Sequence, residues 1–202
     1  TRGNGVLFED WRNTITIQNS TLHEGPFGAT SLFIGHGIPL DGPNLGKVTI
    51  DSNIFEGRGI AIAQTAPGRL NGGFSDIEIT NNHISTINGT KNAISVQAPA
   101  LAGVGQSIGR LHIEGNFIEG DGFSPTDVSH STTGIRITGA MDMVSILDNE
   151  LVGLAAAVRS ASNASGSPTN VIMTQNRLAA NDVGVENTST APISAPANWW
   201  GC

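Results

Sequence analysis

Four side chains that can hold a cation or move a proton occur at matching positions in this sequence: Asp51, Glu78, His112 and Glu114. Each lies among apolar residues that alternate with period two, as on a strand with one buried face. The four should point outward from one sheet, with Glu78 beside His112 and Glu114 diagonal to Glu78. Such a face can bind Ca²⁺ through carboxylate oxygens or supply the two carboxylates of a glycoside hydrolase. The alternative, which we favour, is a solvated strand face without chemistry.

These four residues belong to a phrase that returns about every thirty residues. It reads apolar, any, apolar, two spacers, Asn, any, apolar, and its full copies are Val48–Phe55, Ile77–Ile84, Leu111–Ile118, Val144–Leu151 and Val171–Leu178. A degenerate first copy spans Ile15–Leu22, with Ser20 in the Asn slot. The steps between the Asn slots are 33, 29, 34, 33 and 27 residues. A fixed phrase at a loose period indicates a solenoid of stacked coils.

Each coil should contain two clear strands and a bend. The first strand is the alternating start of the phrase, and a second alternating segment follows each Asn slot. The short piece between them is expected to form a third strand or a corner. The outward positions of the second segment are predicted to be Leu7, Phe33, Ala61, Ser95, Arg136, Ala157 and Gly184. Three cations, Lys47, Arg69 and Arg110, are expected in the loops that precede the phrase.

The Asn of each phrase has a structural explanation. Asn tolerates left-handed backbone angles, so we expect it to turn the corner of the coil. Stacked in successive coils, its amide can also bond to the coils on either side, as Asn ladders do in stacked β structures. We therefore interpret the series as a structural ladder rather than as ligands: Asn53, Asn82, Asn116, Asn149 and Asn176.

The phrase, its period and the closing segment Ala197–Cys202, which contains Asn-Trp-Trp-Gly, resemble a known family. It is the right-handed parallel β-helix repeat family with the pectate-lyase-like coil, in its secreted bacterial form. The resemblance covers essentially the whole chain. It implies an all-β, right-handed parallel β-helix of about seven coils, in an extracellular or cell-surface protein. It does not fix the function, because members include lyases, hydrolases, phage spikes and adhesins.

Enzymes of the resembled family work on the outer face of one strand ladder, walled by long loops. The resemblance thus points to the face of Asp51, Glu78, His112 and Glu114 if the chain is an enzyme. Metal-binding lyases of the family tend to have Asp or Glu pairs together on one strand, and such a pair is missing here. Small residues, polar loops and missing acid–base motifs therefore favour a non-catalytic structural or adhesive module, assembled end to end with copies of itself or with more β-helix. The alternative is a polysaccharide lyase or glycoside hydrolase.

Two further groups of residues are candidates for binding. The insertion at 119–133 contains Asp121, Asp127 and His130, which could hold an ion, although their spacing matches no calcium-loop pattern. A plain surface loop is the alternative that we favour there. Large apolar residues at outward or terminal positions indicate an interface, because exposed apolar patches often mark one: Leu7, Phe33, Trp199 and Trp200.

Composition limits the remaining choices. The net charge of −7 argues against nucleic acid as a partner and is compatible with divalent cations. The sequence has no run long enough for a membrane span. We expect one domain over residues 1–202, cut from a longer chain, with self-association, flanking β-helix segments or a carbohydrate as partners. The single cysteine, Cys202, is expected to be free or to pair outside this segment. No cofactor other than Ca²⁺ is indicated.

Overall fold

The computed structural model describes residues 5–9, 14–24, 30–36, 45–64, 74–87, 92–98, 108–121 and 132–201. Within these ranges every regular element is a β-strand, so this part of the chain is all-β, as predicted. It contains no helix that is long and apolar enough to cross a membrane.

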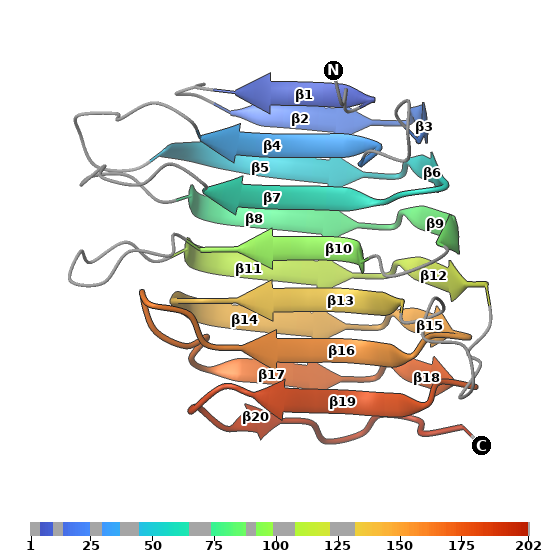
Figure 1. The fold of residues 1–202 in the computed structure, drawn as a ribbon, viewed down its shortest axis with the longest axis vertical. Coiled ribbons are helices and arrows are strands. Elements are labelled where there is room, and N and C mark those ends of the chain that lie inside the picture. The colour runs from blue at the N-terminus through green and yellow to red at the C-terminus, as the bar shows by residue number, and fades with distance from the viewer. Residues whose placement is uncertain are drawn as a thin grey trace.

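Three parallel sheets extend along the molecule, and each takes every third strand (Figure 1). The first sheet contains β1 (Val6–Glu9), β4 (Leu32–His36), β7 (Ile60–Gln64), β10 (Asn92–Gln97), β13 (Thr133–Thr138), β16 (Ala156–Ala161) and β19 (Val183–Thr188). The second contains β2 (Ile15–Gln18), β5 (Leu45–Asp51), β8 (Phe74–Thr80), β11 (Ile108–Glu114), β14 (Met141–Leu147), β17 (Val171–Thr174) and β20 (Ile193–Ser194). The third contains β3 (Thr21–His23), β6 (Ile54–Glu56), β9 (His83–Ile87), β12 (Phe117–Gly120), β15 (Glu150–Val152) and β18 (Arg177–Ala179).

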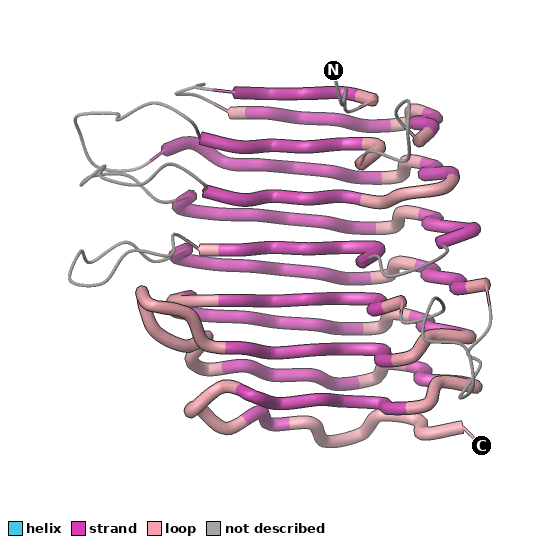
Figure 2. The backbone as a smooth tube through the Cα atoms, in the orientation of Figure 1, coloured by secondary structure: helices cyan, strands magenta, loops and turns pink. Residues whose placement is uncertain are grey.

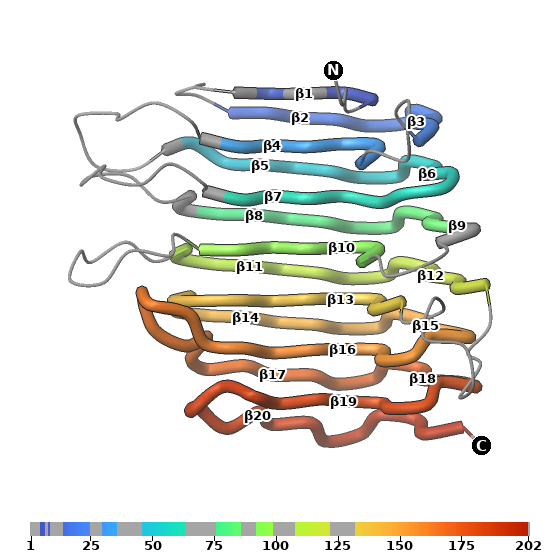
Figure 3. The backbone as a smooth tube through the Cα atoms, in the orientation of Figure 1, coloured from blue at the N-terminus to red at the C-terminus, as the bar shows by residue number. Residues whose placement is uncertain are grey.

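The repeats stack in chain order from one end of the molecule to the other (Figure 3). Each strand inside a sheet therefore pairs in parallel with the equivalent strand of the repeat before and the repeat after. The short piece after the Asn slot is a strand in the structure and forms the third sheet. Short bends join the second sheet to the third (Figure 2), because only two residues separate strands such as β5 and β6. The architecture is a parallel, solenoid-like stack.

The core consists of columns of apolar side chains, one from each strand of a sheet. In the second sheet the register aligns Val48 with Ile77, and Leu111 with Val144. The third sheet contributes Phe55 and neighbours of similar size, and all of these side chains are buried. Burial of one such side chain stabilises a protein by about 1.5–3 kcal/mol. Because the columns continue through every repeat, the repeats share one core.

A ladder of buried amides lies beside this core. The Oδ1 atom of Asn116 accepts hydrogen bonds from the backbone N–H and the Nδ2 group of Asn82, at 3.0 and 2.9 Å. Asn116 donates in the same way to Asn149, and its Nδ2 group also donates to the carbonyl oxygen of Ile79. Asn53, Asn149 and Asn176 repeat the pattern toward the next coil, and each ladder Asn is 1% exposed.

The expectation that these Asn residues adopt left-handed backbone angles is wrong. Positive φ belongs to the residue immediately before each ladder position, for example Asn81 at φ 55° and Asp148 at φ 51°. The complete series is Asn19, Ser52, Asn81, Gly115, Asp148, Gln175 and Ala197. The preceding residue turns the chain, so that the Asn side chain points along the stack and reaches its neighbours. The series also adds Asn198 to the ladder, because Asn176 donates to its Oδ1 atom.

The predicted register of the first sheet is wrong by two residues in its last two strands. Ile135 pairs with Val158 and Arg136 with Arg159, so Arg159 rather than Ala157 lies beside Arg136 on the outward face. Arg159 then pairs with Glu186, so Glu186 rather than Gly184 continues the row of outward residues that contains Arg136. The cause is Ser160, which fills the core position opposite Ile137 and is fully buried. A polar residue in an apolar column conceals the alternation there.

The ladder predicts a specific loss of stability in the Asn116→Leu variant. Leucine removes two donors and one acceptor at a buried corner. The backbone N–H and one side-chain N–H of Asn82 lose their acceptor, and the carbonyl of Ile79 loses its side-chain donor. We expect the free energy of unfolding to fall by roughly 1–3 kcal/mol, as measured by urea denaturation. Asn187→Ala is the matched control, because Asn187 is exposed and bonds only to nearby residues. Equal stability of both variants would contradict a structural ladder.

Candidate functional site

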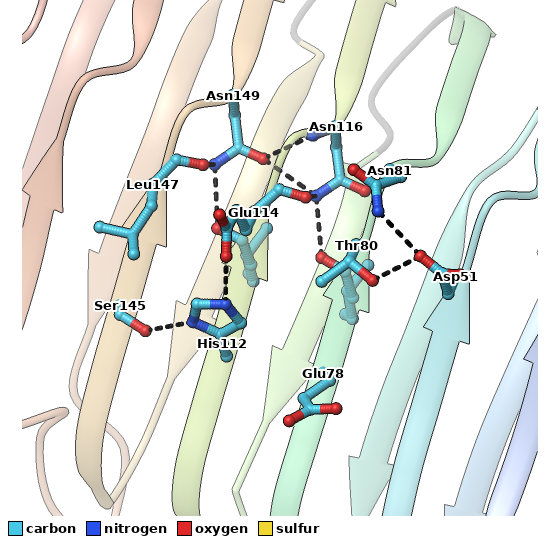
Figure 4. A network of polar contacts seen from close by, with 12 residues as sticks. Asp51, Glu78, Thr80, Asn81, His112, Glu114, Asn116, Ser145, Leu147 and Asn149 are labelled. Carbon is cyan, nitrogen blue, oxygen red and sulfur yellow. Dashed lines mark hydrogen bonds and ion pairs between the residues drawn. The ribbon is translucent and has the colours of Figure 1, made fainter.

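The outward face of the second sheet brings the four predicted residues onto neighbouring strands (Figure 4). His112 on β11 lies opposite Glu78 on β8, and Glu114 lies opposite Thr80. Asp51 on β5 also lies opposite Thr80, on the other side of β8. The predicted neighbours Glu78 and His112 are therefore in register, and Glu114 is diagonal to Glu78.

Ion pairs on this face bind Glu78 to two cations. Its carboxylate lies 2.6 Å from Lys47 Nζ and also contacts the guanidinium of Arg110. Arg110 pairs at 2.9 Å with Asp76, and Lys47 lies 3.8 Å from the same carboxylate. Two cations and two carboxylates thus form one neutral cluster, the charge quartet: Lys47, Asp76, Glu78 and Arg110.

The assignment of Lys47 and Arg110 to loops is wrong. Both lie on strands, since β5 and β11 are seven residues long and begin before the recognised phrase. The register aligns Lys47 with Asp76 and Asp76 with Arg110, so opposite charges alternate across three strands. The sequence interpretation assigned no role to Asp76. Its position two residues before Glu78 indicated that both carboxylates lie on the same face of the strand. Arg69 lies outside the part of the chain that the structure describes.

The hydrogen bonds fix the protonation states of the charge quartet. The bond from Lys47 is the main cause that holds the pKa of Glu78 below its ordinary value; partial burial opposes it, and Arg110 adds to it. The bond to Asp76 is the main cause that raises the pKa of Arg110. Asp51 has its own partners: Thr80 Oγ1 at 2.8 Å and Asn81 Nδ2 at 3.0 Å, which lower its pKa. Asp51, Glu78 and Arg110 are therefore ionised at neutral pH.

His112 belongs to a separate group on the same face. Its Nε2 atom lies 2.6 Å from the Glu114 carboxylate, and its Nδ1 atom lies 2.7 Å from Ser145 Oγ. Ser145 is on β14, directly opposite His112 in the register. The sequence interpretation assigned no role to Ser145, although Ser145 occupies an outward position in the phrase Val144–Leu151, which follows the phrase that contains His112. The structure thus separates the four predicted residues into three groups: Asp51, the charge quartet, and the Ser145–His112–Glu114 chain.

Of the predicted ion site, only Asp121 falls within the described residues. Asp121 is exposed, whereas Asp127, His130 and Cys202 lie outside the described ranges. In the described ranges, no group of three or more His, Cys, Asp or Glu side chains is arranged to hold a metal ion. The Ca²⁺ site stays a prediction.

The predicted apolar interface residues do not form one patch. Phe33 pairs with Leu7 in the first sheet, and its ring lies over Gly35, where an added Cβ would come 2.3 Å from the ring. Trp199 and Trp200 are about half exposed and lie beyond the third and first sheets. The guanidinium of Arg177 lies 5.0 Å from the centre of the Trp199 ring.

No protein-family model matches the chain, and no curated protein or solved structure gives a significant match. The resemblance to the pectate-lyase-like β-helix family therefore stays a prediction.

The lowered pKa of Glu78 predicts how its contribution to stability depends on pH. A carboxylate with a lowered folded-state pKa stabilises the protein above its ordinary value of 4.5, and this contribution is lost as the pH falls through the folded-state value. Glu78→Gln should cost at most about 1 kcal/mol at pH 7, because the ion pairs are partly solvated. The difference from wild type should shrink below pH 4.5. Urea denaturation at several pH values measures it.

Glu119→Gln is the control for this experiment. Glu119 is exposed on β12, and none of the described residues forms an ion pair with it. A wild-type advantage over Glu78→Gln that grows as the pH falls from 5 to 3 would contradict the assignment of the charge quartet.

Proposed function

We propose that this chain is a structural module, a right-handed parallel β-helix presented outside the cell, whose charged face does not cleave polysaccharides. The observation that carries the proposal is the charge quartet, because Glu78 is neutralised by Lys47 and Arg110. The extracellular location rests on the resemblance to the β-helix family alone.

Chain topology supports the handedness in the proposal. Each strand of one sheet is followed by two strands of the other sheets before the chain returns beside it in parallel. Connections of this kind between parallel neighbours are right-handed in about 98% of cases, because of the twist of the strands. A right-handed coil of about seven turns is the simplest path through the three sheets.

The direction of the pKa shifts disfavours the polysaccharide-cleaving alternative. A glycoside hydrolase needs one carboxylic acid with a raised pKa, so that it can protonate the leaving oxygen. The pKa values of Asp51 and Glu78 are lowered instead. A lyase needs a base that is free to take a proton, and within the charge quartet Arg110 is held in its protonated form. These shifts support a stabilising role for the charged face.

A screen for polysaccharide cleavage tests this part of the proposal. We expect no release of reducing ends and no unsaturated product from acidic or neutral polysaccharides, with or without Ca²⁺. The Glu78→Gln variant provides the comparison. Cleavage by the wild type that is absent from this variant would overturn the structural assignment and support a lyase or glycosidase. Binding to a polysaccharide without cleavage would instead identify a carbohydrate partner.

Self-association end to end is the second part of the proposal. The last repeat leaves Val183, at 36% exposure, and Trp200, at 49%, at the end of the apolar columns. The register places Trp200 beneath Leu178, since Arg177 pairs with Trp199. Uncovered core groups and strand edges favour the addition of further β-strands. A second copy that continues the stack would cover both residues.

Light scattering measures this association directly. We expect the mass of the wild type to rise above that of one chain as its concentration increases, and Val183→Lys to reduce the rise. Ile54→Lys is the matched control, because Ile54 is 44% exposed on the outer face of the third sheet rather than at the end of the core. A wild-type monomer at high concentration would contradict the association.

A further inference from the structure

Ser145 is joined to His112 and Glu114 by two short hydrogen bonds in series. Ser145 Oγ lies 2.7 Å from His112 Nδ1, and His112 Nε2 lies 2.6 Å from Glu114 Oε2. An ionised carboxylate can only accept, so Nε2 carries the proton and donates to Glu114. The Nδ1 atom is then free to accept the proton of the Ser145 hydroxyl. Ser145, His112 and Glu114 are thus connected in the order of a nucleophile, a general base and an orienting carboxylate.

The sheet holds the three groups in position (Figure 4). His112 is on β11, between Glu78 and Ser145, and its side chain is 19% exposed. Glu114 is two residues further along the same strand, so its side chain points to the same side. Neither residue belongs to the charge quartet, and no contact between His112 and a cation competes with these bonds among the described residues. The imidazole is therefore fixed between its donor and its acceptor.

An apolar groove lies next to the hydrogen-bonded Ser145–His112–Glu114 group. It has a volume of about 480 Å³ and is lined by residues 169–172 and 191–194. Ile172, one of its lining residues, is 49% exposed and lies directly opposite Ser145 on the neighbouring strand. Met143, two residues before Ser145 on the same face, is 53% exposed. The hydroxyl thus lies at the border between a polar face and an apolar groove, where an ester could place its acyl chain.

We propose that Ser145 is an activated nucleophile that accepts the acyl group of esters with short apolar acyl chains. Its Oγ atom bonds to the ester carbonyl carbon while its proton passes to His112 Nδ1. The carbon–oxygen bond to the alcohol breaks, and Nδ1 returns the proton to the departing alkoxide. Water, activated by the same nitrogen, then hydrolyses the acyl-serine to a carboxylic acid and restores the hydroxyl. Glu114 orients the imidazole and stabilises it while it is protonated.

The sheet also limits the rate of this reaction. Both neighbouring strands pair with β14 at Ser145, so the backbone N–H group there is engaged in the sheet rather than directed at an oxyanion. Loss of one oxyanion donor costs enzymes about 10²–10³ in rate. Acyl transfer to Ser145 should therefore be slow, and covalent capture is a better readout than turnover. An activated Ser145 would add an activity to the structural role proposed above, so the chain would not be wholly non-catalytic.

An alkyl fluorophosphonate tests the proposal, because it bonds to activated serines as fluoride departs. The protein is incubated with the probe, and intact mass and peptide mapping locate the adduct. We expect one adduct, on Ser145, and none in Ser145→Ala. His112→Gln should react at least about 100-fold more slowly, which matches the contribution of a general base. Excess butyrate ester should compete with labelling of the wild type.

Ser194→Ala is the matched control, since Ser194 lines the same groove and lies opposite Ile172, but no described His contacts it. Its labelling should equal that of the wild type. Absence of a wild-type adduct, an adduct on another serine, or equal labelling of His112→Gln would each overturn the proposal. The wild-type mapping decides even if a variant fails to fold. Neither the polysaccharide screen nor the light scattering bears on this result.

Discussion

The fold depends above all on one hydrogen-bonded chain, the ladder of buried amides that extends from Asn53 to Asn176 and ends on the half-buried Asn198. Each amide bonds to the ladder residue of the next repeat and to a carbonyl of the preceding one, for example Asn82 to Asn116 and to Ile50. An amide that bonds along the stack on both sides fixes the spacing and register of successive repeats. Most residues that turn the chain just before it are not glycine and adopt a left-handed conformation, which costs about 1–2 kcal/mol each. The bonds of the ladder and the burial of the neighbouring columns offset that cost.

Register fixed in this way determines which outward side chains meet. A shift of one residue would exchange the core and surface faces of a strand, and the ladder opposes such a shift at the end of every strand of the second sheet. Lys47, Asp76 and Arg110 consequently align across three strands, and His112 and Ser145 align across two. Short cross-strand contacts on this face are thus consequences of the ladder, although none of these residues takes part in it. The outward residues can change with little effect on the stack, since each outward side chain touches mainly its neighbours in adjacent repeats.

Much of this arrangement could be predicted from the sequence, because the Asn phrase marks one strand in each repeat. The alignment of Glu78 with His112 follows from the phrase alone. The parts that failed are those in which local residue type carries no signal. Asn, Ser, Gly, Asp, Gln and Ala all occupy the left-handed position, so no single type identifies it. Ser160 in a core column concealed the register of β16 and β19, and the strands that begin before the phrase concealed Lys47 and Arg110.

The outward face of the second sheet changes character along the stack, and this change connects the fold to its chemistry. On β8 the carboxylates of Asp76 and Glu78 have cationic partners on the strands at either side, Lys47 on β5 and Arg110 on β11. From β14 onward Met143 and Ile172 replace the charges, and the face becomes apolar beside the groove. His112 lies at the junction, bonded to Glu114 and Ser145, and no cation in the described part of the chain competes with the imidazole for either partner. A carboxylate paired with a cation is stable but chemically inert, whereas a carboxylate bonded to an imidazole leaves the second ring nitrogen basic. The same register that neutralises Glu78 therefore leaves Glu114 able to orient His112 toward Ser145.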